Sequence, residues 1–129
     1  MKLEELRKIM IEEKYLKKWA KGTWYWNSDG SVDIIGNVNV KNYTKIKLPF
    51  KFGKITGVFD CCKNRLETLE NCPDEVGTLF DCSENCLCGE ESLQGSPKKV
   101  GSNYIIYGNF PFLKKDIRNV CKVKGFVWV

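Results

Sequence analysis

Two aspartates at equivalent places in the chain are the first candidates for chemistry. Asp60 and Asp81 lie 21 residues apart, and each follows a phenylalanine. If the two segments stack as parallel strands, the carboxylates lie about 5 Å apart on one face, close enough to act together as acid and base. The chain has no histidine, which is the commonest general base near neutral pH. Because the sequence pairs no nucleophile with a base, we expect a protein that is not an enzyme and has no catalytic residues.

The 7 cysteines could instead bind a metal or form disulfides. Their odd number and the absence of an export signal favour free thiols, as in a reducing cytoplasm. Cys61 and Cys82 occupy one position of a repeated segment, where a reduced cysteine serves as a small apolar core residue. A zinc site at Cys82, Cys86 and Cys88 is an alternative, but the chain lacks histidine and a paired C-x-x-C. We therefore expect no cofactor and no metal site.

Charge is segregated along the chain, although the net charge is only +5. Residues 1–54 hold 12 basic and 6 acidic side chains, residues 55–92 hold 2 and 9, and residues 93–129 hold 7 and 1. An acidic middle therefore lies between two basic flanks. This pattern indicates either pairing between the ends and the middle or a docking face for a partner of opposite charge.

A second functional hypothesis, nucleic-acid binding, rests on two lysine-rich segments at residues 41–54 and 114–124. Lysines contact phosphates and aromatic rings stack on bases, and the first segment mixes both residue types. Its candidate phosphate-binding residues are Lys45, Lys47, Lys51 and Lys54. The alternative is that the aromatic residues belong to the core and the lysines to an ordinary solvated surface. The acidic middle also disfavours a continuous nucleic-acid track.

An internal repeat supplies the elements that would position these residues. Residues 59–66 and 80–87 share the pattern Phe-Asp-Cys-x-x-Asn-x-Leu, and a leucine, a proline and a valine follow each copy. A third copy lies 24 residues later around Asn109, and a partial copy begins at Val38. Repeats of about 20–29 residues are typical of leucine-rich-repeat solenoids, whose stacked coils share a core and a parallel sheet.

Within each copy, alternating side chains predict a short strand. Phe59 and Cys61 would face the core, while Val58, Asp60 and Cys62 would face outward. An asparagine follows at the bend, where its side-chain amide can hydrogen-bond the exposed backbone. We expect this role for Asn64, Asn85 and Asn109.

The flanking segments are predicted to cap the ends of the stack, because open sheet edges require protection. An amphipathic helix is predicted from Leu3 to Ala20, with Gly22 as its stop. Its apolar face, expected to pack on the first coil, comprises Leu6, Ile9, Met10, Leu16 and Trp19. Residues 113–121 predict a second helix, and residues 126–129 predict a last strand.

These observations predict one α/β repeat domain, a short leucine-rich-repeat-like solenoid with parallel strands. Residues 1–22 would form a helical cap, residues 23–111 about four coils, and residues 112–129 a helix–strand cap. The chain shows no export signal and no apolar run long enough to span a membrane. We therefore expect a cytoplasmic protein with no membrane partner and no small-molecule substrate.

The outward residues of the strands are the candidate binding site, because solenoids bind partner proteins through an extended sheet face. Stacking would gather apolar and acidic side chains into one patch with charged residues at its rim, and exposed apolar patches mark interaction sites. The candidate partner-binding residues are Val58, Asp60, Lys63, Leu79, Asp81, Glu84, Asn103 and Ile105.

Residues 24–129 resemble a family of small leucine-rich-repeat-like proteins encoded by tailed bacteriophages and some bacteria. The resemblance lies in residues 29–33, 36–40 and 48–54, in the Phe-Asp-Cys repeat, and in the closing residues 116–127. It implies the solenoid architecture and brings no catalytic residues. By analogy, it implies a non-enzymatic inhibitor of a host protein or of a bacterial defence system, of the anti-CRISPR type, acting in the host cytoplasm.

Overall fold

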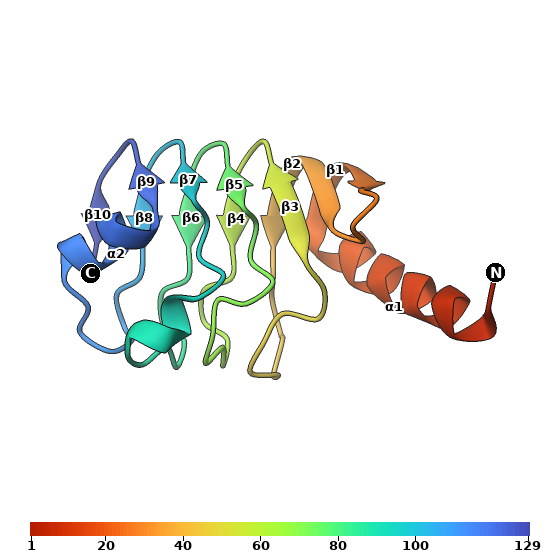
Figure 1. The fold of residues 1–129 in the computed structure, drawn as a ribbon, viewed down its shortest axis with the longest axis horizontal. Coiled ribbons are helices and arrows are strands. Elements are labelled where there is room, and N and C mark those ends of the chain that lie inside the picture. The colour runs from red at the N-terminus through yellow and green to blue at the C-terminus, as the bar shows by residue number, and fades with distance from the viewer.

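The computed structural model describes residues 1–129 as a row of stacked coils (Figure 1). The helices are α1 (Leu3–Trp19), the 3-10 helix η1 (Glu90–Leu93) and α2 (Lys114–Val120). The strands are β1 (Ala20–Trp26), β2 (Val32–Asn39), β3 (Phe52–Ile55), β4 (Phe59–Asp60), β5 (Glu75–Val76), β6 (Phe80–Asp81), β7 (Lys99–Val100), β8 (Tyr104–Ile105), β9 (Lys122–Val123) and β10 (Val127–Trp128). Neither α-helix has the length and apolar character that crossing a membrane requires.

The strands pair in the order β10-β8-β6-β4-β2-β3-β5-β7-β9. Every pairing along this path is parallel, and β1 adds to β2 in the antiparallel direction. Because the first half of β2 pairs with β3 and its second half with β4, the sheet divides there. We call β3, β5, β7 and β9 the odd ladder, and β4, β6, β8 and β10 the even ladder. Figure 1 shows them as two rows of arrows with opposite directions, an α/β solenoid-like fold with the predicted parallel strands.

Each coil contributes one short strand to each ladder. In the even ladder Phe59 pairs with Phe80, 21 residues later, and Phe80 pairs with Tyr104, 24 residues later. The odd ladder repeats the same two steps. The strands of the even ladder follow the predicted repeat, whereas those of the odd ladder were not predicted. Three of them are only two residues long, and a single buried valine, such as Val76, marks each in the sequence.

The core consists of aromatic rings and leucines that both ladders enclose. Phe52, Phe59, Phe80 and Tyr104 are fully buried, and the centroids of successive rings lie 5.0, 6.0 and 4.8 Å apart. These contacts stabilise the stack beyond simple burial of apolar area. Buried leucines complete the coils, namely Leu48, Leu66, Leu69, Leu87 and Leu93.

The repeat asparagines hold the bends between coils, which confirms their predicted role. The Nδ2 of buried Asn85 donates to three carbonyl oxygens at 3.0–3.2 Å, and its Oδ1 accepts from the Leu66 amide at 3.0 Å. The three carbonyls belong to Cys61, Cys82 and Ser83. Asn64 and Asn109 make equivalent bonds in their own coils. Each of these amides therefore ties its own bend to the neighbouring coil.

The residue before each of these bends has a left-handed backbone. The φ angle is 57° at Asn42, 57° at Lys63, 52° at Glu84 and 75° at Gly108, positions that repeat with the coils. This conformation costs a residue other than glycine about 1–3 kcal/mol, so the surrounding hydrogen bonds must impose it. The bend fixes where Lys63 and Glu84 lie, just after the strands of the even ladder.

Helix α1 forms as predicted, but only its last turns contact the coils. Leu16 and Trp19 are buried, and the indole Nε1 of Trp19 donates to the Lys41 carbonyl at 3.2 Å. Leu6 and Met10 are 45% and 61% exposed, so their predicted packing on the first coil is wrong. Figure 1 shows the first part of α1 extending away from the coils. The reason is that β1 follows α1 without a loop, which lets only the end of the helix reach the core.

Two further residues near this junction differ from the prediction. Glu12, which is not among the residues of the predicted apolar face, is buried and accepts a hydrogen bond from Trp26 Nε1 at 3.0 Å. Gly22 is not the helix stop, because α1 ends at Trp19 and Gly22 lies within β1 opposite Gly36. Its φ of 136° and the nearby Ile35 carbonyl exclude a side chain there. Gly22 therefore allows β1 and β2 to approach closely.

Helix α2 and β10 form where the sequence predicts a helix and a last strand. The Arg118 guanidinium donates to the carbonyl oxygens of Val123 and Gly125, both at 3.0 Å. Ile117 and Cys121 turn into the core. These contacts join α2 to the turn between β9 and β10.

Deleting residues 1–9 is expected to change the free energy of unfolding by less than about 1 kcal/mol, because exposed residues with few contacts contribute little. Deleting residues 1–20 also removes Leu16 and Trp19 and should lower the melting temperature clearly. Thermal unfolding followed by circular dichroism would compare the two truncations. Equal destabilisation by both would contradict the exposed position of the first turns.

Candidate partner-binding face

The even ladder brings outward residues of successive coils into one row. Asn39 pairs with Asp60, Asp60 with Asp81, Asp81 with Ile105, and Ile105 with Trp128. Neighbouring strands lie about 4.8 Å apart, so these side chains follow one another as a continuous line. We call this row and the outward residues beside it the even face. The register of the paired strands is what brings the residues of the even face together.

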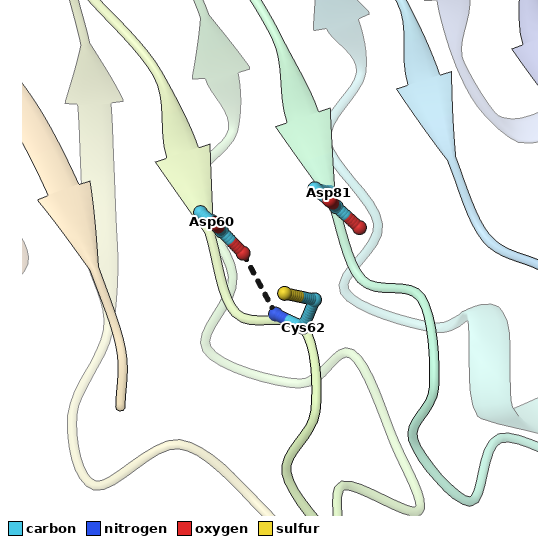
Figure 2. Close-up of side chains that lie close together, drawn as sticks. All are labelled: Asp60, Cys62 and Asp81. Carbon is cyan, nitrogen blue, oxygen red and sulfur yellow. Dashed lines mark hydrogen bonds between the residues drawn. The ribbon is translucent and has the colours of Figure 1, made fainter. Parts of the chain in front are cut away.

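Asp60 and Asp81 lie side by side in this row (Figure 2). Oδ1 of Asp60 accepts from the Cys62 amide at 2.9 Å. Oδ1 of Asp81 accepts from the Ser83 amide at 2.9 Å and from its hydroxyl at 2.6 Å. A carboxylate that bonds the backbone two residues on stabilises a turn. Both aspartates therefore shape the exit of their strands, which gives them a structural role.

The Cys62 thiol completes a cluster with these two carboxylates. One oxygen of each aspartate and the sulfur all lie within 4.8 Å of one another. Burial, followed by the hydrogen bond to Asp60 and its negative charge, raises the pKa of Cys62 to about 12. The thiol is therefore protonated at neutral pH, and a protonated thiol is a weak nucleophile and a weak metal ligand. The cluster provides no activated nucleophile.

The other predicted residues lie beside this row. Val58, Leu79 and Asn103 are half-buried and form a second row just before the strands of the even ladder. Lys63 and Glu84 are exposed just beyond the strands, where the backbone is left-handed. The structure thus places all of the predicted partner-binding residues along the even ladder.

The sequence prediction missed two exposed aromatic residues of the even face. Trp128 is 56% exposed and extends the row of Ile105, and Phe126 is 71% exposed beside it. The sequence does contain a signal for this strand, because residues 125–127 repeat the glycine–apolar–apolar order of residues 57–59. Assigning residues 126–129 to a cap concealed that they add a further strand to the even ladder.

A groove of about 310 Å³ lies at the β2 end of the even face. Val58 and Asp60 line it, and three lysines contribute to it, namely Lys18, Lys21 and Lys41. The even face therefore begins at a groove of mixed charge, continues through two carboxylates, and ends at exposed aromatic rings. Such a surface can take up an apolar anchor beside a basic group of a partner.

The cysteines do not gather into the alternative zinc site. Cys61 and Cys82 are fully buried, which confirms their predicted inward position. Cys86 and Cys88 are exposed, so they do not share a site with Cys82. Burial raises the pKa of the Cys82 thiol well above its ordinary value, as expected for a residue that packs as an apolar group.

The first lysine-rich segment lacks the stacking surface that the nucleic-acid hypothesis requires. Its aromatic residues Tyr43, Phe50 and Phe52 are buried, so that part of the hypothesis is wrong. Their size and apolar character made the core the more favourable place for the rings.

The lysines of this segment do not form one patch either. Lys47 lies 3.6 Å from Glu70, and Lys51 lies 2.9 Å from Asp74. Lys45 is exposed in the loop before β3. Lys54 lies on β3, in the odd ladder, whereas the other three lysines lie outside the strands. Three of the four predicted lysines, Lys47, Lys51 and Lys54, are therefore paired with carboxylates of the next coil.

Register, exposure and charge together make the even face the best candidate site. Exposed aromatic residues occur beside half-buried apolar ones, and the nearby polar groups have identified structural partners. Comparisons of the chain with protein-family profiles, with curated protein sequences and with solved structures gave no match.

Proposed function

We propose that this protein is a non-enzymatic binding module that holds a partner protein on its even face. In this proposal the chain is a short leucine-rich-repeat-like solenoid, capped by α1 at one end and by α2 with β10 at the other. The observation that carries the proposal is the continuous outward row that ends at exposed Trp128. Tryptophan is among the residues that contribute most energy at protein interfaces.

The charge of the even face indicates what kind of partner surface would complement it. Asp60 and Asp81 place two carboxylates at its centre, flanked by Leu79 and Ile105. A complementary surface carries basic side chains at its middle and apolar ones around them, because opposite potentials favour and orient association. The lysine-containing groove beside Val58 suits an anchor that is apolar with an acidic neighbour.

The biological part of the proposal rests on the resemblance to phage-encoded proteins. The partner is then a host protein, and the activity is inhibition of that protein or of a defence system, of the anti-CRISPR type, in the host cytoplasm. Since the same architecture serves many functions, this part requires its own test. Cells with an active CRISPR system and cells with other defence systems would each express the chain. Restored plating of a targeted phage in one of these strains supports inhibition, and restriction unchanged in all of them counts against it.

A triple variant tests the even face directly. Leu79→Ser, Ile105→Ser and Trp128→Ser remove its apolar anchors and leave both aspartates to stabilise their turns. The matched control is Ile46→Ser with Leu113→Ser, since both residues are exposed and lie outside the even face. Circular dichroism would establish that each variant is folded.

We expect the wild type and the control to capture the same protein from a bacterial lysate, and the triple variant to lose it. Calorimetric titration with the purified partner should then show at least about 30-fold weaker binding, because loss of a central anchor costs about 2 kcal/mol or more. A folded triple variant that binds as tightly as the wild type would place the interface elsewhere.

A further inference from the structure

The odd ladder carries a groove that the proposed function does not use. Its volume is about 570 Å³, and the strands β3, β5, β7 and β9 form its floor. Its charged lining residues are Lys54, Glu75, Lys99, Lys122 and Lys124. The four lysines and one glutamate give the groove a net charge of +3.

Strand register aligns these charges. Lys54 pairs with Glu75, Glu75 with Lys99, and Lys99 with Lys122, so the four residues occupy one outward row across the ladder. Successive positions are about 4.8 Å apart. Lys124 lies beside the end of the row, two residues after Lys122 on the same coil. Residues far apart in the sequence thus form a line of positive charge that the sequence alone did not reveal.

Nearby carboxylates do not neutralise this line. Glu75 lies 3.9 Å from both Lys54 and Lys99; the two lysine side chains are largely exposed, and that of Glu75 is partly exposed. Exposed ion pairs of this kind contribute little energy. Lys122 and Lys124 form no ion pair in the structure. At least two ammonium groups are therefore available to a ligand.

The lining also defines which anion fits. No aromatic ring and no arginine lines the groove, so it offers neither stacking for bases nor a fork for carboxylates. The amides of Gly77 and Gly101 on its floor already donate to the Ile55 and Val76 carbonyls. What remains is a row of flexible point charges, which suits phosphates spaced along a chain. Binding of single strands commonly depends on aromatic stacking, which is absent here.

We propose that the groove of the odd ladder binds the phosphate backbone of duplex nucleic acid without regard to base sequence. This binding uses the odd ladder and not the even face, so it stands or falls separately from the proposed protein partner. Contact through lysines alone makes the affinity strongly dependent on salt, because each phosphate contact releases counterions.

Fluorescence anisotropy with a mixed-sequence DNA duplex, measured over a series of salt concentrations, tests this proposal. We expect Lys99→Gln and Lys122→Gln each to weaken binding and to reduce the slope of log affinity against log salt by about 1. Glu75→Gln should strengthen binding, because it removes the one negative charge of the groove. The control is Lys14→Gln, an equal charge change on exposed helix α1, which should leave the salt slope unchanged.

Several results would overturn the proposal. They are the absence of duplex binding at low salt, an equal effect of Lys14→Gln and Lys99→Gln, and a Glu75→Gln variant that binds no better. Tighter binding of polyglutamate would indicate an acidic protein instead, and tighter binding of polyphosphate would indicate a free phosphate chain. The triple variant of the even face should bind the duplex like the wild type, which separates this site from the first.

Discussion

Replacing Asn85 with alanine is expected to lower the free energy of unfolding by about 2 kcal/mol or more. The change leaves the buried Leu66 amide without a partner and removes one of two hydrogen bonds from each of three carbonyl oxygens. These carbonyls keep their bonds from Asn64, Asn109 and the Lys63 amide. Each buried polar group that loses its hydrogen bond costs about 1–3 kcal/mol. Urea denaturation of the variant and the wild type would measure the difference.

Asn64→Ala is the matched control for this effect. Asn64 also donates to three carbonyl oxygens and accepts from one amide, but it is only half-buried, so water can replace part of what is lost. Its cost should be clearly smaller than that of Asn85→Ala. Equal losses at both positions would mean that burial does not determine the strength of the asparagine bonds, and a loss below about 1 kcal/mol at Asn85 would contradict their role.

The second large effect is a loss of stability in alkali. A hydrogen bond with Cys72 and burial raise the pKa of Cys61, and burial raises that of Cys82, both well above the ordinary 9.0. The folded protein therefore keeps both thiols protonated at a pH where the unfolded chain releases the protons. The stabilisation is complete below about pH 9 and declines as the pH rises, by about 1.4 kcal/mol per pH unit for each thiol.

Urea denaturation in the presence of a reducing agent, at pH values on both sides of 9.0, would measure this decline. Cys82→Ala should reduce the slope of stability against pH by the contribution of one thiol, about 1.4 kcal/mol per pH unit. The same change also lowers stability at neutral pH. Cys86→Ala changes an exposed thiol and should leave the pH dependence as it is in the wild type. Stability that stays constant up to pH values well above 9.0 would contradict the account. At still higher pH, the Tyr104 hydroxyl contributes in the same direction, because burial raises its pKa.

The parts of the fold that the sequence predicted are those in which one residue type has one physical role. Phe59 and Phe80 recur at a fixed step with an asparagine at a fixed distance, and the structure gives both the expected places. The odd ladder was not predicted because two-residue strands show no alternation. The exposed first turns of α1 were not predicted because an apolar stripe indicates a buried face without indicating how much of the helix reaches the core.

The candidate sites show a similar division. Asp60 and Asp81 could be placed together because they lie in copies of the same segment. Trp128 lies in a diverged copy of the even-ladder strand, and the outward position of the odd ladder changes residue type from one coil to the next. The repeat marks these strands only weakly, so strand pairing was needed to show that their outward residues form rows.

The fixed step between coils constrains how this chain can evolve. Because Phe59 and Phe80 are equivalent positions, duplication of the residues between them would insert one coil and preserve the pairs on either side. Every inserted coil adds a strand to both ladders, about 4.8 Å to each. The even face and the groove of the odd ladder can therefore lengthen or shorten only together. If both proposals hold, selection for a longer contact surface with the partner protein would also lengthen the surface that binds duplex nucleic acid.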